Sequence, residues 1–240
     1  ECGLEGLEPR SRKPHIIHRT STDIVEQVIA VRQGTNWCPH KIAGHMRMQG
    51  LSLGHMTVYR ILCRSNLNNP LQKPRVKRSY VRWERKHSNS LWQCDLKIVG
   101  SEWLITILDD HSRYVTASDI FKEGTAENVI WLLDQAIHEC PKPREILTDH
   151  GSQFYSVRHG TSTFNQFCRE NGINHILGGI GKPTTLGKIE RWFRTYDQEH
   201  ARFQLHRKFI EYYNWKRPHM SLNYNTPAQV YFRDVPNVLG

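Results

Sequence analysis

Three acidic residues stand where a folded chain could gather carboxylates for metal chemistry. Asp95 lies inside the apolar run "LWQCDLKIV", Asp149 ends the short run "REILTD", and Glu190 lies in the amphipathic segment "GKIERWFRTY". Two neighbouring carboxylates repel and raise one another's pKa unless a cation neutralises them. Hard divalent ions such as Mg²⁺ are held by one or two carboxylates and keep positions open for water and phosphate oxygens. We therefore expect Asp95, Asp149 and Glu190 to be metal ligands and catalytic residues of a two-metal site for phosphodiester transfer.

The elements that must position these carboxylates follow from the pattern after residue 90. Two apolar runs flank the turn at Gly100-Ser101, which is a hairpin signal, and the run "YVTASDIF" follows. Helical patterns then alternate with "REILTD" and "INHIL", giving the order βββαβαβα. This order predicts an α/β fold, a mixed five-stranded sheet flanked by helices, in its ribonuclease-H-like form. In that form the first and fourth strands are neighbours, which brings Asp95 beside Asp149.

Three short helical patterns precede this region. "STDIVEQVIAVRQG" opens with a capping signal at Asp23, and "CPHKIAGHMRMQG" and "MTVYRILCR" follow. A glycine turn before the third helix is typical of a small all-α helix-turn-helix domain, although a generic three-helix scaffold would show the same pattern. Gly54 takes the N-cap place of that third helix. The side chains expected to reach DNA base edges are His55, Met56, Tyr59 and Arg60.

Charge and composition favour nucleic acid as the partner. The formal net charge of the 240 residues is +10, which suits a polyanion. Seven of the sixteen residues from 72 to 87 are Lys or Arg, as in a solvated linker or in a connector that follows DNA phosphates. Near Glu190 the candidate phosphate contacts are Lys182, Lys188, Arg191 and Arg194, with a solvated basic helix face as the alternative. No apolar run is long enough for a membrane span, and the six scattered cysteines suit reduced thiols of an intracellular protein.

These patterns divide the chain into five parts. The expected boundaries are a linker remnant at 1–20, the helix-turn-helix domain at 21–68, a basic linker at 69–89, the catalytic core at 90–203 and a C-terminal extension of the core at 204–240. The opening "ECGLEGLEPRSRKPH" has no initiator Met and reads as the tail of an earlier module, so we expect a fragment of a longer chain. For "KRPHMSL" in the extension, both packing on the core and contact with DNA stay open.

Several other polar residues could do chemistry, but simpler roles compete. Asp109 and Asp110 follow the second strand, where turn capping and contact with Arg113 are favoured over metal binding. His150 either touches a phosphate or closes the turn after Asp149. The group Cys38, His40 and His45 lacks a second Cys pair, so the helix-turn-helix interpretation is favoured over a zinc site.

The motifs together resemble a known family. "LWQCDLKIV", "LDDHSRY", "TDHGSQF", "GKIERWFRTY" and "YYNWKRPHMSLNYNTPAQVY" look like the integrase core of DDE transposases from bacterial and archaeal insertion sequences, with retroviral integrases as distant relatives. The resemblance spans residues 85–235 and implies Asp95, Asp149 and Glu190 as the triad, with Mg²⁺ (or Mn²⁺ in its place) as cofactor. It implies hydrolysis at transposon ends, followed by attack of the freed 3′-hydroxyl on target DNA. The implied setting is a homo-oligomer on DNA in a prokaryotic cytoplasm, associated with the nucleoid and not with a membrane.

Two departures from the family pattern stand out. Forty residues (150–189) separate Asp149 from Glu190, slightly more than is usual. Many relatives carry Lys or Arg seven residues after the Glu, where this chain has Asp197, so Arg194 or Lys188 would have to supply that DNA contact. The competing functions are a nuclease of the same fold and a DNA-binding protein with an inactive core. The intact triad argues against the second of these.

Overall fold

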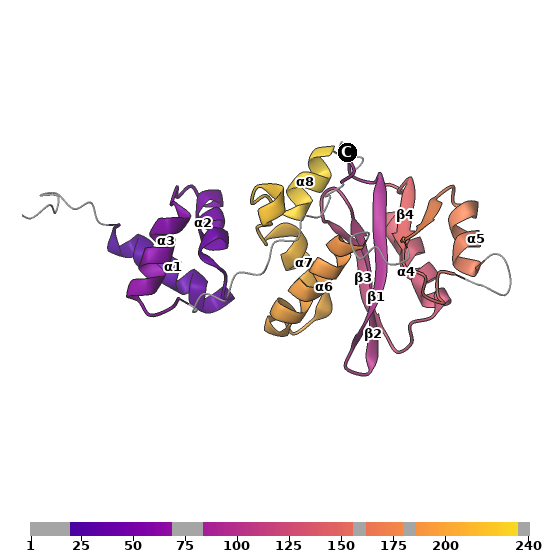
Figure 1. Cartoon of the computed structure of the whole chain (residues 1–240), viewed down its shortest axis with the longest axis horizontal. Coiled ribbons are helices and arrows are strands. Elements are labelled where there is room, and N and C mark those ends of the chain that lie inside the picture. Colours follow the sequence, from indigo (N-terminus) through magenta and orange to yellow (C-terminus); the bar gives the residue numbers. More distant parts are fainter. Residues whose placement is uncertain (1–19, 69–83, 156–161, 180–185, 235–240) are drawn as a thin grey trace, which may run out of the picture.

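The computed structural model describes residues 20–68, 84–155, 162–179 and 186–234 (Figure 1). The predicted linker remnant before residue 20, most of the basic linker (69–83) and Lys182 lie outside the described residues. None of the helices in these ranges is long and apolar enough to cross a membrane.

The N-terminal helices pack around one apolar core. They are α1 (Thr22–Thr35), α2 (Pro39–Met48) and α3 (His55–Arg64). Their inward side chains include Val28, Ile42 and Leu62, all fully buried. The capping signal at Asp23 was placed wrongly, because Ser21 is the N-cap residue and Asp23 lies inside the first turn. There its negative charge still favours the positive end of the helix. The predicted start of α3 after Gly54 is confirmed.

Five strands form one mixed sheet in the order β3-β2-β1-β4-β5. They are β1 (Leu91–Val99), β2 (Glu102–Asp109), β3 (Val115–Phe121), β4 (Glu145–Thr148) and β5 (Asn174–Leu177). β1 is antiparallel to β2 and parallel to β4. The expected ribonuclease-H-like sheet, with the first and fourth strands as neighbours, is therefore confirmed.

Helices cover both faces of this sheet (Figure 1). On one face lie α4 (Ala126–Glu139) and α5 (Thr163–Glu170), and on the other α6 (Gly187–Glu199) and α7 (His206–Trp215). Successive side chains of a strand point to opposite faces. Accordingly, Ile105 and Ile107 of β2 join the core under α4, while Leu104 and Leu108 join the core under α6. Because both its faces are buried, β2 is apolar along most of its length.

The segment after α6 folds onto the core. It contains η2 (His200–Arg202), α7, η3 (Met220–Leu222) and α8 (Pro227–Asp234). Asn214 at the end of α7 continues the hydrogen bonding of the edge strand β3: its Oδ1 accepts from Val115 N and its Nδ2 donates to Val115 O, both at 2.9 Å. Within "KRPHMSL", Arg217 is 5% exposed, so packing on the core is the outcome at that residue.

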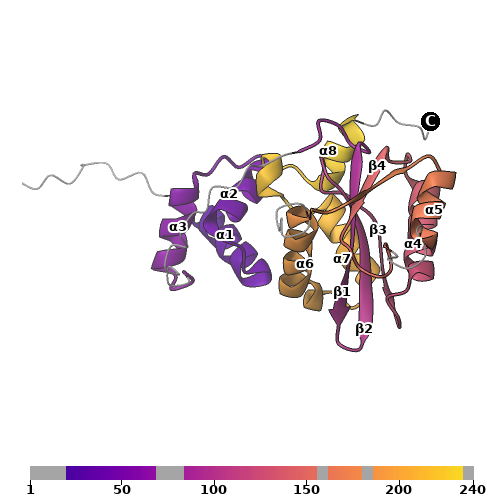
Figure 2. The same ribbon diagram turned by 45° about the vertical axis from the view of Figure 1, so that its right-hand side comes forward.

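A buried group of charges joins the helix-turn-helix domain to the core. Glu199, the last residue of α6, receives two hydrogen bonds from Arg217, at 3.0 and 2.9 Å, and pairs with Lys41 of α2 at 3.3 Å. Tyr212 of α7 packs against the apolar core of the three helices. Figure 2 shows α2 on the side of its domain that faces the C-terminal segment. We call Lys41, Glu199 and Arg217 the interdomain ion group.

A substitution at Gly44 of α2 tests the contact between the helix-turn-helix domain and the C-terminal segment. A Cβ at Gly44 would lie 2.1 Å from Cδ1 of Tyr224, so the ring or the whole contact would have to shift. We expect Gly44→Ala to lower the free energy of unfolding by about 1–3 kcal/mol, as overpacking does. Gly34→Ala in α1 is the matched control, because nothing lies within 4 Å of its added Cβ. It should gain about 0.5–1 kcal/mol from helix propensity alone. Urea unfolding measures both, and equal gains would show that Gly44 and Tyr224 do not meet in solution.

Candidate active site

The parallel pairing of β1 and β4 brings two carboxylates together. Gln93 of β1 is in register with Leu147 of β4. Asp95 and Asp149 each follow two residues later. Because parallel strands rise together and side chains alternate, the two aspartates reach the same level on the same face of the sheet. Asp149, the residue directly after β4, thus places its carboxylate beside Asp95.

The charges of Asp149 and Glu190 both act on Asp95. Its pKa is raised to about 7, first by burial and then by the charges of Asp149 and Glu190, against the effect of a hydrogen bond from Leu96 N–H to Oδ1 at 2.8 Å. The three residues predicted from the sequence therefore share one electrostatic environment. A carboxyl group in such a place is a candidate for function, since it gains from a cation that neutralises its neighbours.

Asp149 is exposed, and the turn after β4 holds its orientation. Gly151 N donates to Asp149 Oδ1 at 2.9 Å. A Cβ at Gly151 would lie 2.5 Å from Oε1 of Gln153 and 2.9 Å from that same Asp149 oxygen, so a larger residue would require these side chains to shift. The strand end is anchored by the buried Thr148, whose hydroxyl lies 2.8 Å from Nε2 of His175. His150 is exposed and lies edge-on to Tyr155, with a ring distance of 5.9 Å.

Glu190 comes from the first turn of α6. The helix buries Ile189, Trp192, Phe193 and Tyr196 against the sheet, as its sequence pattern predicts. Glu190 is exposed, as are Arg191 and Arg194. Two cations beside the catalytic candidate suit contacts with DNA phosphates. That role of Arg191 and Arg194 remains a prediction.

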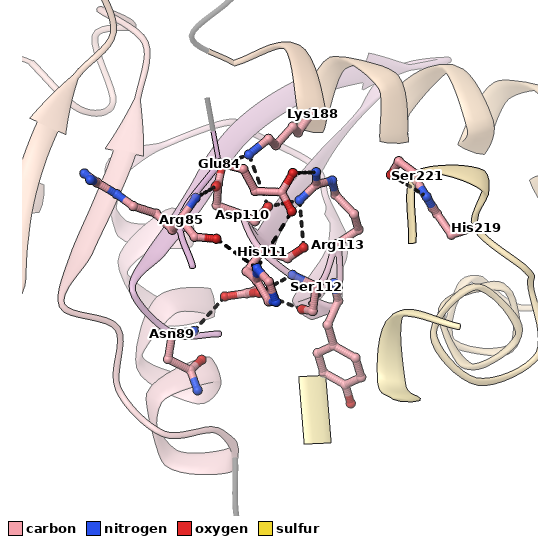
Figure 3. A network of polar contacts seen from close by, with 12 residues as sticks. Glu84, Arg85, Asn89, Asp110, His111, Ser112, Arg113, Lys188, His219 and Ser221 are labelled. Atoms are coloured by element: carbon pink, nitrogen blue, oxygen red, sulfur yellow. Dashed lines mark hydrogen bonds and ion pairs between the residues drawn. The ribbon is translucent and has the colours of Figure 1, made fainter. Parts of the chain in front are cut away.

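Lys188 has a different neighbour from the one expected. Its Nζ lies 2.6 Å from Oδ1 of Asp110, a side chain with no exposed surface (Figure 3). Its charge is therefore already compensated inside the protein, and its side chain is only 16% exposed. The structure thus favours a structural role for Lys188 over the phosphate contact that the sequence suggested.

The turn after β2 is held by the polar residues that the sequence placed there. Asp109 accepts hydrogen bonds from Ser112 N at 2.8 Å, Ser112 Oγ at 2.6 Å and Asn89 N at 2.8 Å. Arg113 donates to the carbonyl of Asp110 and to Glu84 (Figure 3). Asp109 thus caps the turn, and the Asp110 carbonyl contacts Arg113. The Asp110 side chain binds Gln93 and Lys188. The participation of Glu84 has no signal in the sequence, because it precedes the sheet in the basic run.

Asp197, at the position where the family resemblance led us to expect a cation, pairs with Lys97. Lys97 lies two residues after Asp95 on β1, so this ion pair ties the last turn of α6 to the strand that carries the first aspartate.

The predicted reading helix exposes most of its candidate residues. His55, Met56 and Arg60 of α3 are exposed, and Tyr59 is half-buried. The ring of His55 stacks on His40 at 4.0 Å. DNA contacts by His55, Tyr59 and Arg60 stay predictions.

The candidate ligands for a metal ion are the carboxylates of Asp95, Asp149 and Glu190. Among the described residues, no group of three or more His, Cys, Asp or Glu side chains forms a ready-made metal site. His40 and His45 face the rings of His55 and Trp37. Asp95, Asp149 and Glu190 nevertheless fit a hard divalent cation in chemistry, because all are oxygen donors and the charges of Asp149 and Glu190 both act on Asp95.

Family comparisons agree with this geometry. Two models, each described as an integrase core domain, match residues 85–183 and 171–227, and a homeodomain-like model matches residues 1–62. Integrase core domain models thus match residues 85–227 of the chain. The matched ranges contain β1, β4 and α6, and so all three carboxylates.

Individual relatives of the integrase core are transposon and insertion-element proteins. The chain is 32% identical over 135 residues to the transposase of transposon Tn552 from Staphylococcus aureus, covering 48% of this chain and 27% of that protein. It is 25% identical over 205 residues to a 31.7 kDa protein of insertion element IS407 from Burkholderia multivorans, covering 75% and 70%. The chain thus spans about a quarter of the length of the Staphylococcus protein.

A solved structure shares the fold. A chain in the simian T-cell lymphotropic virus intasome, solved in complex with a PP2A regulatory subunit, aligns with a TM-score of 0.52 at 18% identity, covering 89% of this chain and 76% of its own. At that identity the likeness concerns the fold alone.

Proposed function

We propose that this chain is the DNA-binding and catalytic part of a transposase that cuts transposon ends and joins them to target DNA. The proposal is supported by the parallel register of β1 and β4, which places Asp95 and Asp149 at the same level, and by the charges of Asp149 and Glu190, which both raise the pKa of Asp95. Three carboxylates together could hold the metal ions of phosphodiester transfer better than any one of them alone.

In this proposal the three carboxylates hold Mg²⁺, and Mn²⁺ substitutes for it. The cation supplies activation of the attacking oxygen and neutralisation of charge on the leaving oxygen. Asp95 and Asp149 are fixed by the strands, and Glu190 is brought to them by α6. In the first reaction water breaks a phosphodiester bond and frees a 3′-hydroxyl. In the second that hydroxyl forms a bond to a target phosphorus while a target P–O bond breaks.

DNA contacts are assigned to two surfaces. His55, Tyr59 and Arg60 of α3 would read bases, as the second helix of a helix-turn-helix does in the major groove. Arg191 and Arg194 would hold phosphates beside Glu190. We also infer at least a dimer, since two transposon ends must be joined together.

Plasmid cleavage tests this function without knowledge of the natural DNA ends. Wild-type protein and Asp149→Asn are incubated with supercoiled plasmid in Mn²⁺, Mg²⁺ or EDTA. Because Asp149 holds the metal, we expect nicking with either metal, none in EDTA, and a loss of about 10³-fold or more in the variant. Glu170→Gln in α5, an exposed carboxylate away from β1 and β4, is the matched control and should keep wild-type activity.

The products distinguish the competing functions. Joining of a labelled DNA end to the plasmid supports a transposase, whereas nicking without joined products identifies a nuclease. Equal nicking by wild type and Asp149→Asn would contradict the assigned site. DNA binding without metal-dependent cleavage by the wild type would identify a binding protein with an inactive core.

A further inference from the structure

Gln93 is a buried polar side chain two residues before Asp95, and both ends of its amide are bonded. Its Nε2 donates to Oδ1 of Asp110 at 2.8 Å, and its Oε1 accepts from the backbone N–H of Ile189 at 3.2 Å. The side chain is 1% exposed. Asp110 can only accept and the Ile189 amide can only donate, so these partners fix the orientation of the amide group.

The bond to Ile189 fills a gap at the start of α6. The first N–H groups of a helix have no partner within the helix, and a Ser, Thr, Asp or Asn at the N-cap usually satisfies one of them. Leu186 is the N-cap residue of α6 and makes no side-chain cap. Gln93 supplies the missing acceptor from another element, 96 positions away in the chain.

The same contact ties the helix to the strand that carries Asp95. Gln93 and Asp95 lie on β1, while Ile189 immediately precedes Glu190 on α6. Asp110 strengthens the tie, because it accepts a hydrogen bond from Gln93. It also pairs with Lys188 (Figure 3). Two successive residues of α6, Lys188 and Ile189, are therefore anchored to β1 and to the turn after β2.

We propose that Gln93 is a positioning residue, which fixes Glu190 relative to Asp95 by capping α6 from within β1. The proposal rests on the function assigned above, in which these two carboxylates hold a metal together. In this proposal Gln93 contacts neither DNA nor metal. It affects the position of Glu190 only through its hydrogen bond with the Ile189 amide.

Gln93→Met tests the proposal, because Met has a similar volume but cannot replace either hydrogen bond. We expect the Ile189 amide to exchange with solvent roughly 10-fold faster in NMR experiments, the size of one lost buried hydrogen bond. The affinity for Mn²⁺, measured by calorimetry without DNA, should fall roughly 10-fold or more, as when an outer partner of a metal ligand is removed. The turnover number should fall by a similar factor while the KM for DNA stays unchanged.

Gln229→Met is the matched control. Oε1 of Gln229 also accepts from a backbone N–H at a helix start, that of Thr226 at 2.8 Å, but on a helix with none of the three carboxylates. It should leave Mn²⁺ affinity and turnover unchanged. If Gln93→Met does not fold, Gln93→Asn replaces it: its side chain is one methylene too short for both bonds, and it should shift the same measurements in the same direction.

The outcomes separate this inference from the proposed function. Unchanged Mn²⁺ affinity in a folded Gln93 variant, or unchanged exchange of the Ile189 amide, would overturn the positioning role. A wild-type protein that binds Mn²⁺ but neither cuts nor joins DNA would overturn the proposed function. In that case faster exchange and weaker Mn²⁺ binding in Gln93→Met would still support the positioning of Glu190.

Discussion

Asp95→Asn should abolish DNA cleavage and at the same time stabilise the metal-free protein. The folded protein raises the pKa of Asp95 to about 7 from an ordinary value of 3.8, so ionising this group costs folding free energy. A shift of about three units corresponds to at most about 4 kcal/mol, and partial exposure reduces this to about half. Asn keeps the shape and an acceptor oxygen for Leu96 N–H but carries no charge.

The gain should depend on pH in a definite direction. Below about pH 4 Asp95 is protonated in both states, so the substitution gains little. As pH rises from about 4 to about 7, the unfolded state releases its proton first, and the wild type loses stability relative to the Asp95→Asn variant; above about 7 the gain is constant. Urea unfolding of both proteins in EDTA at pH 4, 6 and 8 measures this difference in the free energy of unfolding. Asp119→Asn on β3 is the control, since exposed Asp119 makes the same bond to its next amide, Ile120 N, at 2.8 Å.

A pH-independent gain in Asp95→Asn, or an equal gain in Asp119→Asn, would contradict the assigned environment of Asp95. Retained cleavage would remove Asp95 from the catalytic residues. A more stable metal-free protein that no longer cleaves DNA is the result expected if the buried, negatively charged Asp95 destabilises the fold until a cation binds.

Glu199→Ala should be the most destabilising substitution of a charged residue in the interdomain ion group. Glu199 is 3% exposed and Arg217 is 5% exposed, so the variant leaves the cation of Arg217 buried without its carboxylate. Breaking a buried pair in this way costs about 3–5 kcal/mol. Because Lys41 loses the same partner, the contact between α2 and the core should weaken as well. Urea unfolding gives the loss in stability, and proteolysis within residues 69–83 gives the loss of domain contact.

The pH dependence of this effect has the opposite sign to that of Asp95. Burial alone would raise the pKa of Glu199, but the hydrogen bonds and charges of Arg217 and Lys41 hold it below its ordinary value of 4.5. The stabilisation is therefore complete above about pH 4.5 and is lost as pH falls through the lowered pKa. Glu211→Ala is the control, because Glu211 pairs with Lys208 at 2.9 Å on the exposed surface, where such pairs add little. Equal losses in the two variants would show that Glu199 is not buried in solution.

The sheet and the catalytic candidates were predictable because their signals are local or come from a family pattern. Asp95 and Asp149 end up side by side because each stands at a fixed offset in an apolar strand, and strand order follows from the βββαβαβα sequence. Ile189 and Phe193 follow the helical period and are buried as expected.

The rest depends on contacts between distant segments. The helices α7 and α8 were missed because the stretch between them, "KRPHMSLNYNT", is rich in turn residues, and the aromatic side chains that they bury include Phe209, Tyr213 and Tyr231. Lys188 looks like a DNA contact in the sequence, since nothing local indicates that Asp110 lies beside it. Gln93 was missed for the same reason: its partners lie 17 and 96 positions away.

The helix α6 carries Glu190 in its first turn and Glu199 at its last residue, nine residues later. That separation corresponds to roughly 14 Å along the helix axis. One end of this helix thus carries Glu190 of the proposed active site, and the other end contacts the domain that carries α3. In the proposed function, this connection would fix the spacing between the bases that α3 reads and the bond that is cut. Since each inserted base pair turns the DNA by roughly 35°, such a fixed spacing would tolerate few insertions between the two points, whereas a loosely tethered reader would tolerate many.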